Sequence, residues 1–439
     1  MGPIARVRDF FLPEPAVEPI RDPATITAEY ARWRKRMFFA MFTGYAVLYF
    51  CRKNIPAALP VMGDELHYSN TELGLISSTL YVTYGLGKFA NGVLADGANI
   101  RGFLCTALVV SGLINLAFGS MATLWVFAFL WGANGWFQSM GFPPIARGMT
   151  LWYTNEGKAT RWAFWTCSHQ AGTAAVMGLT GWILTWGGWR WCFWLPAAMC
   201  VVLGLVLWFL MADTPESKGL RSAEAFVPAP EEATESYWLT FRRCVLLNRN
   251  VWAIGLADLF AYVVRFGALD WVPKFLKDER GYQAGSAAFS SAIMPLFGVA
   301  GVLCAGVISD RLFHSRYRSV NIAAFAVLCV MLWGFWAIGD ASPWLDLVMM
   351  AAVGFFVEVP QSLLGAVAAV DAGGSARVAS AAAGLVGFLS YVGATASGIG
   401  TGYVIDLYGW GGAFALWIGC GLAGLLTCWL VWKEAPAAK

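Results

Sequence analysis

Gly92-Val-Leu-Ala-Asp96 recurs as Gly306-Val-Ile-Ser-Asp310, 214 residues further along the chain. Two pairs of basic residues repeat at nearly the same spacing: Arg52 with Arg265 at 213 residues, and Arg161 with Arg377 at 216. One such motif would be weak evidence, but three features that share an offset near half of the 439 residues indicate an internal repeat. The sequence therefore predicts two halves that are built alike.

The composition predicts the class of protein. Charged residues make up 13% of the chain and hydrophobic residues 58%, whereas an ordinary soluble domain has roughly 25% charged residues. So few charges would not cover the surface of a soluble fold of this size, and the high hydrophobicity excludes a disordered chain. The net charge of +3 gives no support for binding nucleic acid. We therefore expect a membrane protein.

The cysteines and the first residues add two expectations. No pair among the ten cysteines has the C-x-x-C spacing, so neither a metal site nor a disulfide framework is predicted. No cofactor is expected. The first 36 residues are polar and lack the apolar segment of a signal peptide. The first apolar run is therefore expected to remain as a membrane span.

Twelve apolar runs are each about as long as the roughly 20 residues that a helix needs to cross a bilayer. They lie at 37–62, 72–95, 101–120, 122–146, 160–186, 190–211, 250–275, 285–309, 319–339, 344–370, 377–402 and 409–432. We expect an N-terminal tail at 1–36, a six-helix bundle at 37–211, a linker at 212–249, a second six-helix bundle at 250–432 and a C-terminal tail at 433–439. The end of the linker, near 236–247, mixes aromatic and basic residues and predicts a short amphipathic helix.

The distribution of basic residues predicts the orientation. Twenty-two of the 30 Lys and Arg residues lie on the side of the termini, and four lie on the other side. The positive-inside rule then places both termini in the cytoplasm, for a multi-pass protein of the bacterial inner membrane. The remaining four cations fall inside the spans: Arg52, Lys53, Lys88 and Arg265.

Spans that repeat in the same order and orientation predict a parallel repeat about an axis along the membrane normal. This arrangement, with the Gly-x-x-x-Asp motif followed by Arg101, resembles the major facilitator superfamily. The resemblance implies an all-α membrane protein with 12 transmembrane helices in two pseudo-symmetric six-helix bundles around a central cavity. It also implies that two loops gate the cavity by latching one bundle to the other, through Asp96, Arg101, Asp310 and Arg311.

The charges inside the spans predict the chemistry of the site. Arg52 and Arg265 lie near the middle of the first and seventh spans, where a charge is costly and normally has a partner. The acids available are Asp258, Asp270 and Glu358, so four cations face three acids. A purely structural ion pair is the alternative, but the excess of cations favours an anion site. Two guanidinium groups would grip phosphate or carboxylate oxygens in a bidentate manner.

Aromatic residues accompany these cations at helical spacing. Tyr45, Tyr49 and Arg52 follow at i, i+4 and i+7, Tyr84 precedes Lys88 by one turn, and Tyr262 precedes Arg265 by three residues. Tyrosine hydroxyls can bind phosphate oxygens or sugar hydroxyls, although interior packing is the alternative. His169 lies in the middle of the fifth span. It is either an interior hydrogen-bonding residue or a contact for the anion.

Longer motifs add a more specific resemblance. They are Tyr49-Phe-Cys-Arg52-Lys53-Asn54, Tyr84-Gly85-Leu-Gly-Lys88-Phe89, Asp96-Gly-Ala-Asn99-Ile-Arg101, Gly141-Phe-Pro-Pro-Ile-Ala-Arg147, Trp165-Thr-Cys-Ser-His169 and Arg265-Phe-Gly-Ala-Leu-Asp270-Trp271. From about residue 30 to 430, the chain resembles the organophosphate:phosphate antiporters. The resemblance implies that Arg52 and Arg265 bind phosphate, that Lys88 and His169 belong to the cavity, and that Lys53 and Asp270 belong to a salt-bridge network.

The chain departs from that family in one respect. The family usually has a Glu in the eighth span where this chain has Pro295, and this chain instead has Glu358 in the tenth span. We expect Glu358 to replace the missing acid by approaching the same network from a neighbouring helix.

The resemblance implies a secondary transporter that exchanges an organophosphate, either a hexose phosphate or glycerol 3-phosphate, for inorganic phosphate. Its partners would be these anions and the lipid bilayer, and a monomer is expected. The alternative is a transporter-like sensor of hexose phosphate that signals to a membrane histidine kinase. Two stretches resemble that sensor: Tyr30-Ala-Arg-Trp33-Arg-Lys-Arg36 and the residues from Gln361 to Gly365. An enzyme is not expected, because the sequence has no plausible catalytic triad, metal cluster or phosphate-binding glycine loop.

Overall fold

A computed structural model of the chain describes residues 10–96, 98–153, 158–221, 236–312, 317–339, 342–368, 372 and 378–431. Within these residues every regular element is a helix. The first half contains α2 (Pro23–Leu48), α3 (Ile55–Leu66), α4 (Asn70–Asp96), α5 (Ile100–Gly119), α6 (Leu124–Ser139), α7 (Phe142–Trp152), α8 (Lys158–Ile183) and α9 (Trp191–Leu210). The second half contains α10 (Tyr237–Phe241), α11 (Arg249–Arg280), α12 (Ala284–Ser291), α13 (Ile293–Leu312), α14 (Tyr317–Ala337), α15 (Pro343–Ser362) and α17 (Ala379–Leu426).

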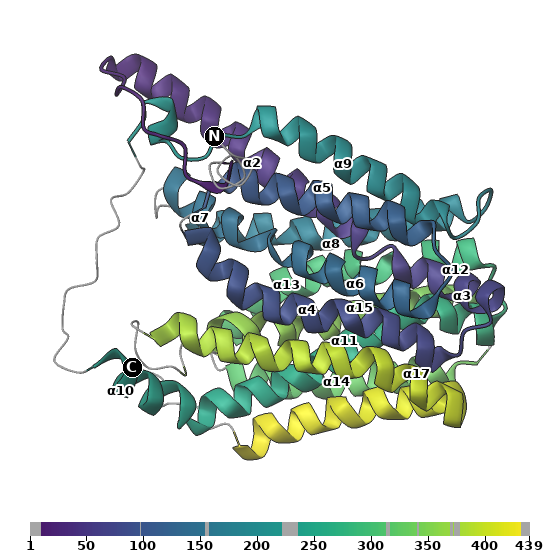
Figure 1. The fold of residues 1–439 in the computed structure, drawn as a ribbon. Helices are drawn as coiled ribbons and strands as arrows, with labels where there is room; N and C mark the ends of the chain where they lie inside the picture. Colours follow the sequence, from purple (N-terminus) through teal and green to yellow (C-terminus); the bar gives the residue numbers. More distant parts are fainter. Residues whose placement is uncertain are drawn as a thin grey trace.

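These helices follow the predicted spans. Where the structure describes them, the twelve apolar runs each lie on one helix or on two consecutive helices. In the described part of the chain, seven helical segments are by themselves long and apolar enough to cross a membrane. Figure 1 shows the helices of the first half packed together above those of the second half. The predicted class, an all-α membrane protein with two helical bundles, is confirmed.

Two helices extend beyond the predicted spans, and one further predicted helix is found. α2 begins at Pro23, because Asp22 caps it by accepting a hydrogen bond of 2.9 Å from the backbone N–H of Thr25. Its first residues therefore extend into the predicted tail. The spans predicted at 377–402 and 409–432 share α17, which bends at Gly409, where φ is +64°. The predicted amphipathic helix near 236–247 is confirmed as α10 followed by a π-helical turn.

The first predicted span is not a continuous helix. α2 ends at Leu48, a 3₁₀ turn follows, and α3 begins at Ile55. Pro56 explains the break, since it cannot donate to the carbonyl of Arg52 and its ring would clash with that carbonyl.

Buried amide side chains bind the carbonyl groups that this break leaves free. Asn134 donates to the Cys51 carbonyl over 2.7 Å, and Gln138 donates to the Leu48 carbonyl over 2.9 Å. Free backbone groups at membrane depth are tolerated only when protein groups satisfy them. These two side chains of α6 therefore stabilise a break in the helix in the middle of the membrane.

The two halves touch at the end of the molecule where α3 and α12 lie, on the right in Figure 1. We call this the far end, and the end with the first turn of α2 and α10 the tail end. At the far end the Asp406 carboxylate accepts hydrogen bonds from the backbone N–H groups of Asn70 and Thr71, over 3.1 and 2.7 Å. Lys277 forms an ion pair with Asp64, which lies 213 residues earlier in the chain. These contacts join α4 to α17 and α3 to α11, and they close the far end.

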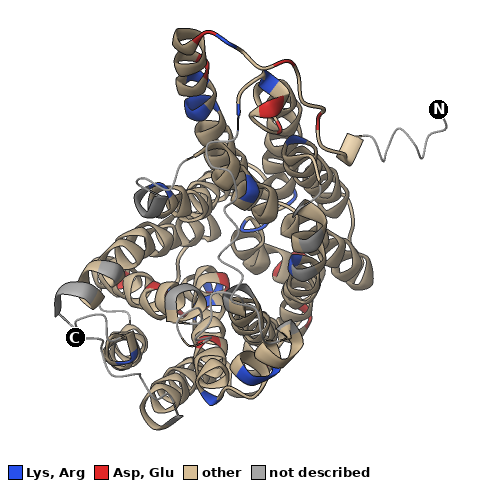
Figure 2. Cartoon of the chain, turned by 90° about the vertical axis from the view of Figure 1, so that its left-hand side faces the viewer, with Lys and Arg blue, Asp and Glu red and all other residues tan. Residues whose placement is uncertain are grey.

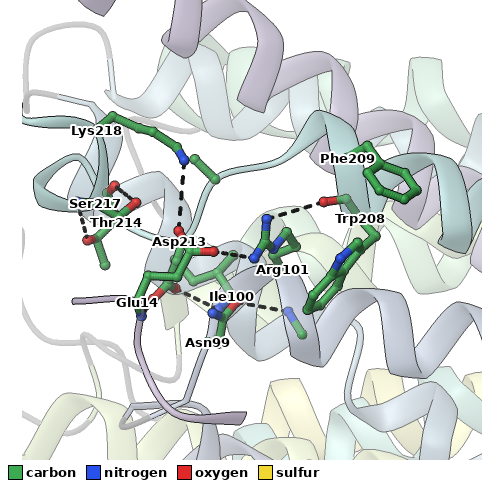
Figure 3. A network of polar contacts seen from close by, with 12 residues as sticks. Glu14, Asn99, Ile100, Arg101, Trp208, Phe209, Asp213, Thr214, Ser217 and Lys218 are labelled. Carbon is green, nitrogen blue, oxygen red and sulfur yellow. Dashed lines mark hydrogen bonds and ion pairs between the residues drawn. The ribbon is translucent and has the colours of Figure 1, made fainter. Parts of the chain in front are cut away.

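At the tail end, the segment before α2 lies against the first bundle (Figure 3). Asp213 accepts hydrogen bonds from the backbone N–H groups of Glu14, over 2.9 Å, and of Ile100, over 2.8 Å. Burial raises the pKa of Asp213 above its usual value, and the two N–H donors oppose that rise. Figure 2 looks onto this end and shows helices with few charged residues along their length, as the composition requires.

Candidate functional site

A cavity of about 320 Å³ lies between the two bundles. Its described lining comes from both halves and contains four cations but no Asp or Glu. The lining residues are Tyr45, Tyr49, Arg52, Lys53, Tyr84, Lys88, Phe142, Trp162, Trp165, Thr166, His169, Gln170, Thr173, Tyr262, Arg265, Phe266, Leu269, Gln361 and Tyr391. All eight residues that the sequence nominates for substrate binding therefore lie around one cavity.

Arg52 projects into the cavity from the break between α2 and α3. Its guanidinium lies 4.1 Å from the ring centre of Tyr84 and 5.1 Å from that of Tyr49. It donates a long hydrogen bond of 3.4 Å to the hydroxyl of Tyr391 on α17. The side chain is buried, and among the described residues it has no carboxylate partner. Aromatic faces attract a cation without neutralising it, so Arg52 keeps its full charge for a ligand.

Arg265 reaches the cavity from the middle of the unbroken helix α11. Its Nε donates to the Oε1 of Glu358 on α15 over 2.6 Å. Glu358 is 1% exposed, and its Oε2 has no hydrogen-bond partner among the described residues. The acid that the sequence places in the tenth span thus contacts the arginine of the seventh. The second carboxylate oxygen remains available to another donor.

Lys53 and Asp270 form the third charged group of the site. The Lys53 Nζ lies 2.5 Å from the Oδ1 of Asp270 and 3.0 Å from the Tyr81 hydroxyl, which in turn donates to Asp270. Lys53 belongs to the first bundle and Asp270 to the second. This buried pair therefore joins the bundles on the far-end side of the cavity, in the contact that the resemblance implies.

Lys88 and Asp258 have no ion-pair partner among the described residues. Lys88 is exposed to the cavity and lies 5.5 Å from the ring centre of Tyr391. Asp258 is 1% exposed and accepts a hydrogen bond from Ser390. The three acids of the predicted spans therefore hold two of the four cations, Lys53 and Arg265. Arg52 and Lys88 lie at the cavity without an ion-pair partner among the described residues, and their positive charge would attract an anion.

The predicted tyrosines and His169 line the cavity in two groups. Tyr45 and Tyr49 pack on each other with ring centres 5.4 Å apart, and Tyr49 lies 5.7 Å from His169. Tyr84 packs on Tyr391 at 4.8 Å, and Tyr262 packs on Tyr391 at 5.8 Å. Tyr391 therefore lies between the two bundles.

Several cavity residues have no clear signal in the sequence. Tyr391 lies in an apolar run without a neighbouring charge, whereas Gln170 and Gln361 are amides near His169 and Glu358, so a search for cations with flanking tyrosines finds none of the three. Gln361 donates to the Tyr262 hydroxyl over 3.5 Å. The one indication in the sequence is that these residues are polar within apolar spans. That indication does not show which face of the helix lies toward the cavity.

The expected gating residues are only partly visible. Asp96, Asp310 and Arg311 lie outside the side chains that the structure describes. Arg101 pairs with Glu14, its guanidinium packs 4.1 Å from the Trp208 ring, and it donates to the Trp208 carbonyl over 3.3 Å (Figure 3). These partners all belong to the first bundle and its tail, so in this conformation the observed contacts of Arg101 hold the tail rather than the other bundle.

Among the described residues, no three His, Cys, Asp or Glu side chains gather in a group suited to a metal ion. The cavity presents hydrogen-bond donors and fixed positive charge. What this arrangement can do is bind a small anion between two bundles that hold separate halves of the binding site.

Comparison with known proteins agrees with the cavity and the repeat. A model of the Major Facilitator Superfamily matches residues 41–395. The probable hexose phosphate transport protein of Chlamydia pneumoniae is 34% identical over 97% of this chain and 96% of its own length. The glycerol-3-phosphate transporter of Bacillus subtilis is 31% identical, over 98% and 99%. The membrane sensor protein UhpC of Escherichia coli is 32% identical, over 97% and 99%.

A solved structure shows the same fold. It is a bacterial homologue of the human lysosomal transporter Spinster, in an inward-facing and unoccupied conformation. Its TM-score is 0.73 at 14% identity, over 91% of this chain and 95% of that one. The chain therefore belongs to the Major Facilitator Superfamily and, within it, to the organophosphate:phosphate antiporter family, and it is a membrane transporter rather than an enzyme.

Proposed function

We propose that the protein exchanges an organophosphate for inorganic phosphate by alternating access. The observation that carries this proposal is the excess of positive charge in the cavity, where Arg52 and Lys88 have no acidic partner among the described residues. Arg52 and Arg265 would clamp one phosphate group between the bundles, and Lys88 and His169 would complete its contacts. A guanidinium fits phosphate oxygens with two parallel hydrogen bonds, which gives this site its geometric preference.

The contacts between the bundles suggest how exchange proceeds. The far end is closed by Asp406 and by the Lys277–Asp64 pair. The cavity lies on the tail side of these contacts. We place the tail end in the cytoplasm, because 22 of the 30 Lys and Arg residues lie on that side. The conformation described here is then inward-facing, in a protein of the bacterial inner membrane.

The charges also explain why an empty carrier would reorient slowly. Without an anion, nothing draws Arg52 and Arg265 together across the bundle interface, because Arg265 is paired with Glu358 and Arg52 has no anionic partner among the described residues. A bound dianion attracts both, and it lowers the free energy of the state in which the bundles close around it. Glu358 holds Arg265 while the cavity is empty and gives way when phosphate arrives. One anion must therefore replace another before the bundles rock back.

The test is phosphate exchange in proteoliposomes. Labelled inorganic phosphate should enter vesicles that contain phosphate, glucose 6-phosphate or glycerol 3-phosphate, and it should enter empty vesicles slowly. Arg265→Lys should lower exchange about 100-fold, since a point charge cannot replace the fork. Uptake that is equally fast into empty vesicles, or near-normal exchange by Arg265→Lys, would refute the proposal.

A sensor is the second candidate, because the similarity to the membrane sensor protein UhpC covers 97% of this chain. A sensor would bind hexose phosphate in the same cavity and pass the signal to a membrane histidine kinase, with little net transport. The proteoliposome assay separates the two functions, since a sensor would bind the ligand without rapid exchange.

The division of the chain is part of the same proposal. We assign residues 37–211 and 250–432 to two bundles that rock as units, with 212–249 as the linker and with 1–36 and 433–439 as cytoplasmic tails. One chain contains the complete cavity, so we propose that a monomer is the working unit. Size-exclusion chromatography of the purified protein with light scattering would test this.

A further inference from the structure

A second cavity, of about 340 Å³, lies between α4 of the first bundle and α17 of the second. Figure 1 shows these two helices side by side. The described lining comes from α4 between Tyr81 and Leu86 and from α17 between Phe388 and Ile399, and it contains no charged residue. We call this cavity the lateral groove. It shares only Tyr391 with the described lining of the central cavity.

The groove exists because α4 and α17 touch toward the far end and separate toward the tail end. A Cβ on Gly74 would lie 2.3 Å from a backbone oxygen of α17, and the Ser78 hydroxyl donates to the Thr395 carbonyl over 2.8 Å. Seven residues after Ser78, which is about 10 Å along the helix, a Cβ on Gly85 would meet only the side chain of Tyr391. A wedge-shaped gap therefore opens on the tail side of the contact.

The rim of the groove is apolar and faces outward. Val82, Leu86, Phe388 and Val392 are each between 43% and 57% exposed. They lie on the outer surface of a protein that crosses a membrane, where acyl chains surround it.

The floor of the groove contains three hydroxyl groups, and each of them has a partner elsewhere. The Tyr81 hydroxyl donates to Asp270, and the Tyr391 hydroxyl accepts from Arg52. Thr395 donates to the backbone carbonyl of Tyr391 over 2.8 Å. The groove therefore offers a ligand almost only carbon atoms, and a polar ligand would lose hydrogen bonds on entering it.

We propose that the lateral groove binds one acyl chain of a phospholipid from the leaflet at the tail end. The chain would make dispersion contacts with the groove walls, which an empty groove lacks. A membrane helix of another protein is a poor fit, because a helix with its side chains is about 10–12 Å across and the wedge closes at the backbone contact of α4 and α17. An acyl chain is narrow and flexible enough to enter.

The groove separates the two bundles on the tail side, so an acyl chain in it would favour the conformation described here. Closure of the tail end, which the proposed alternating access requires, would bring α4 and α17 together and narrow the groove. A ligand that binds one of two conformations better shifts the equilibrium toward it. This consequence rests on the proposed function, whereas the binding site does not.

The experiment is photolabelling of the full-length protein in vesicles of phosphatidylethanolamine and phosphatidylglycerol. A fraction of the phosphatidylethanolamine carries a diazirine in its acyl chain, and the adducts are mapped by mass spectrometry. Tyr81 and Tyr391 are 4% and 9% exposed, so only a chain inside the groove should label them. Tyr84 is the internal control, because it is equally buried and lines the central cavity but not the groove.

Ala396→Trp fills the groove, since Ala396 lines it and is exposed. Labelling of Tyr81 and Tyr391 should fall at least about tenfold, because a filled groove has no room for a chain. Phosphate exchange should slow about tenfold, because the indole keeps α4 and α17 apart. Ala326→Trp is the matched control, since Ala326 is exposed on α14, outside the groove, and it should change neither result.

Several results would overturn the inference. Adducts on the rim residues Leu86 and Phe388 without any on Tyr81 or Tyr391 would mean that lipid only surrounds the protein. Unchanged labelling of Ala396→Trp, or labelling of Tyr84 as strong as that of Tyr391, would also exclude the groove. Normal exchange by an Ala396→Trp variant that has lost the adducts would refute the effect on rocking. A wild type with groove adducts but no phosphate exchange would instead contradict the proposed function alone.

Discussion

Arg52 and Arg265 occupy equivalent positions in the two halves, but their surroundings differ. Arg52 lies at a break between two helices and contacts only aromatic rings and a hydroxyl among the described residues. Arg265 lies in the middle of a continuous helix and pairs with Glu358 over 2.6 Å. The difference teaches that one arginine has no acidic partner among the described residues, whereas the other is already paired with a carboxylate.

One position of the repeat explains much of this asymmetry. Tyr84 stacks 4.1 Å from the Arg52 guanidinium. The residue 214 positions later is Gly298 on α13, which has no side chain to offer Arg265. A Cβ at Gly298 would lie only 3.0 Å from the Cγ of Glu358. The glycine therefore leaves the space into which Glu358 fits, and a carboxylate takes the place that an aromatic ring has in the first half.

Neutralising each arginine tests this asymmetry with the largest expected effects. Arg52→Gln and Arg265→Gln should both lower phosphate exchange about 100-fold or more, since each removes a charge-assisted fork. Their stabilities should differ. Arg265→Gln leaves Glu358 buried without its partner, which costs about 3–5 kcal/mol, whereas Arg52→Gln removes a charge that no acid balances. Thermal unfolding of the purified variants measures this, and equal losses would contradict the comparison.

Glu358→Gln tests the competition between the carboxylate and the anion. Without the carboxylate, Arg265 is free for phosphate, so phosphate should bind about tenfold more tightly, as expected for the loss of one competing charge-assisted bond. Exchange should slow, because the anion leaves less readily. Isothermal titration measures the affinity. Asp278→Asn is the matched control, since Asp278 pairs with Lys274 on the same helix, towards the far end. Weaker phosphate binding by Glu358→Gln would contradict the competition.

Asn134→Ala tests the break between α2 and α3, whereas the equivalent helix of the second half, α11, is continuous. It removes the shorter of two hydrogen bonds to the Cys51 carbonyl, which also accepts from Asn115 over 3.2 Å, and should lower the free energy of unfolding by about 1 kcal/mol. Asn321 is an equally buried asparagine, but it donates to Tyr317 within its own helix, so Asn321→Ala should cost less. Chemical unfolding of both variants gives the two values. Equal costs would mean that the break has no special need for its amide partners.

The smallest effect is expected at Asp213, which holds the segment before α2 against the first bundle. Because burial raises the pKa of Asp213, the folded protein binds this proton more tightly than the unfolded chain does. The contribution of Asp213 to stability should therefore decline as pH rises from below 3.8 through the raised pKa. Asp213→Asn should lack that decline. Comparing the unfolding temperatures of the two proteins across this range tests the sign.

Much of the fold and part of the site follow from the sequence. The membrane class follows from composition, and the two arginines follow from their common offset in apolar runs. The break in the first span could have been predicted from Pro56. The sequence of that span does not show, however, whether amide side chains on other helices will donate to the backbone carbonyls that the break leaves free. Tyr391 and Gln170 were not predicted, because neither lies one helical turn from a cation in its own helix.

The sequence by itself determined that four cations and three acids would share the membrane interior, because every charge in an apolar run is visible in the chain. The tertiary structure decided which of them meet. Glu358 lies 93 residues from Arg265, and Asp270 lies 217 residues from Lys53, so neither pairing is a property of local sequence. Pairing depends on which helix faces pack together. That packing leaves Arg52 and Lys88 without an acid among the described residues, which is the observation that carries the proposed anion site.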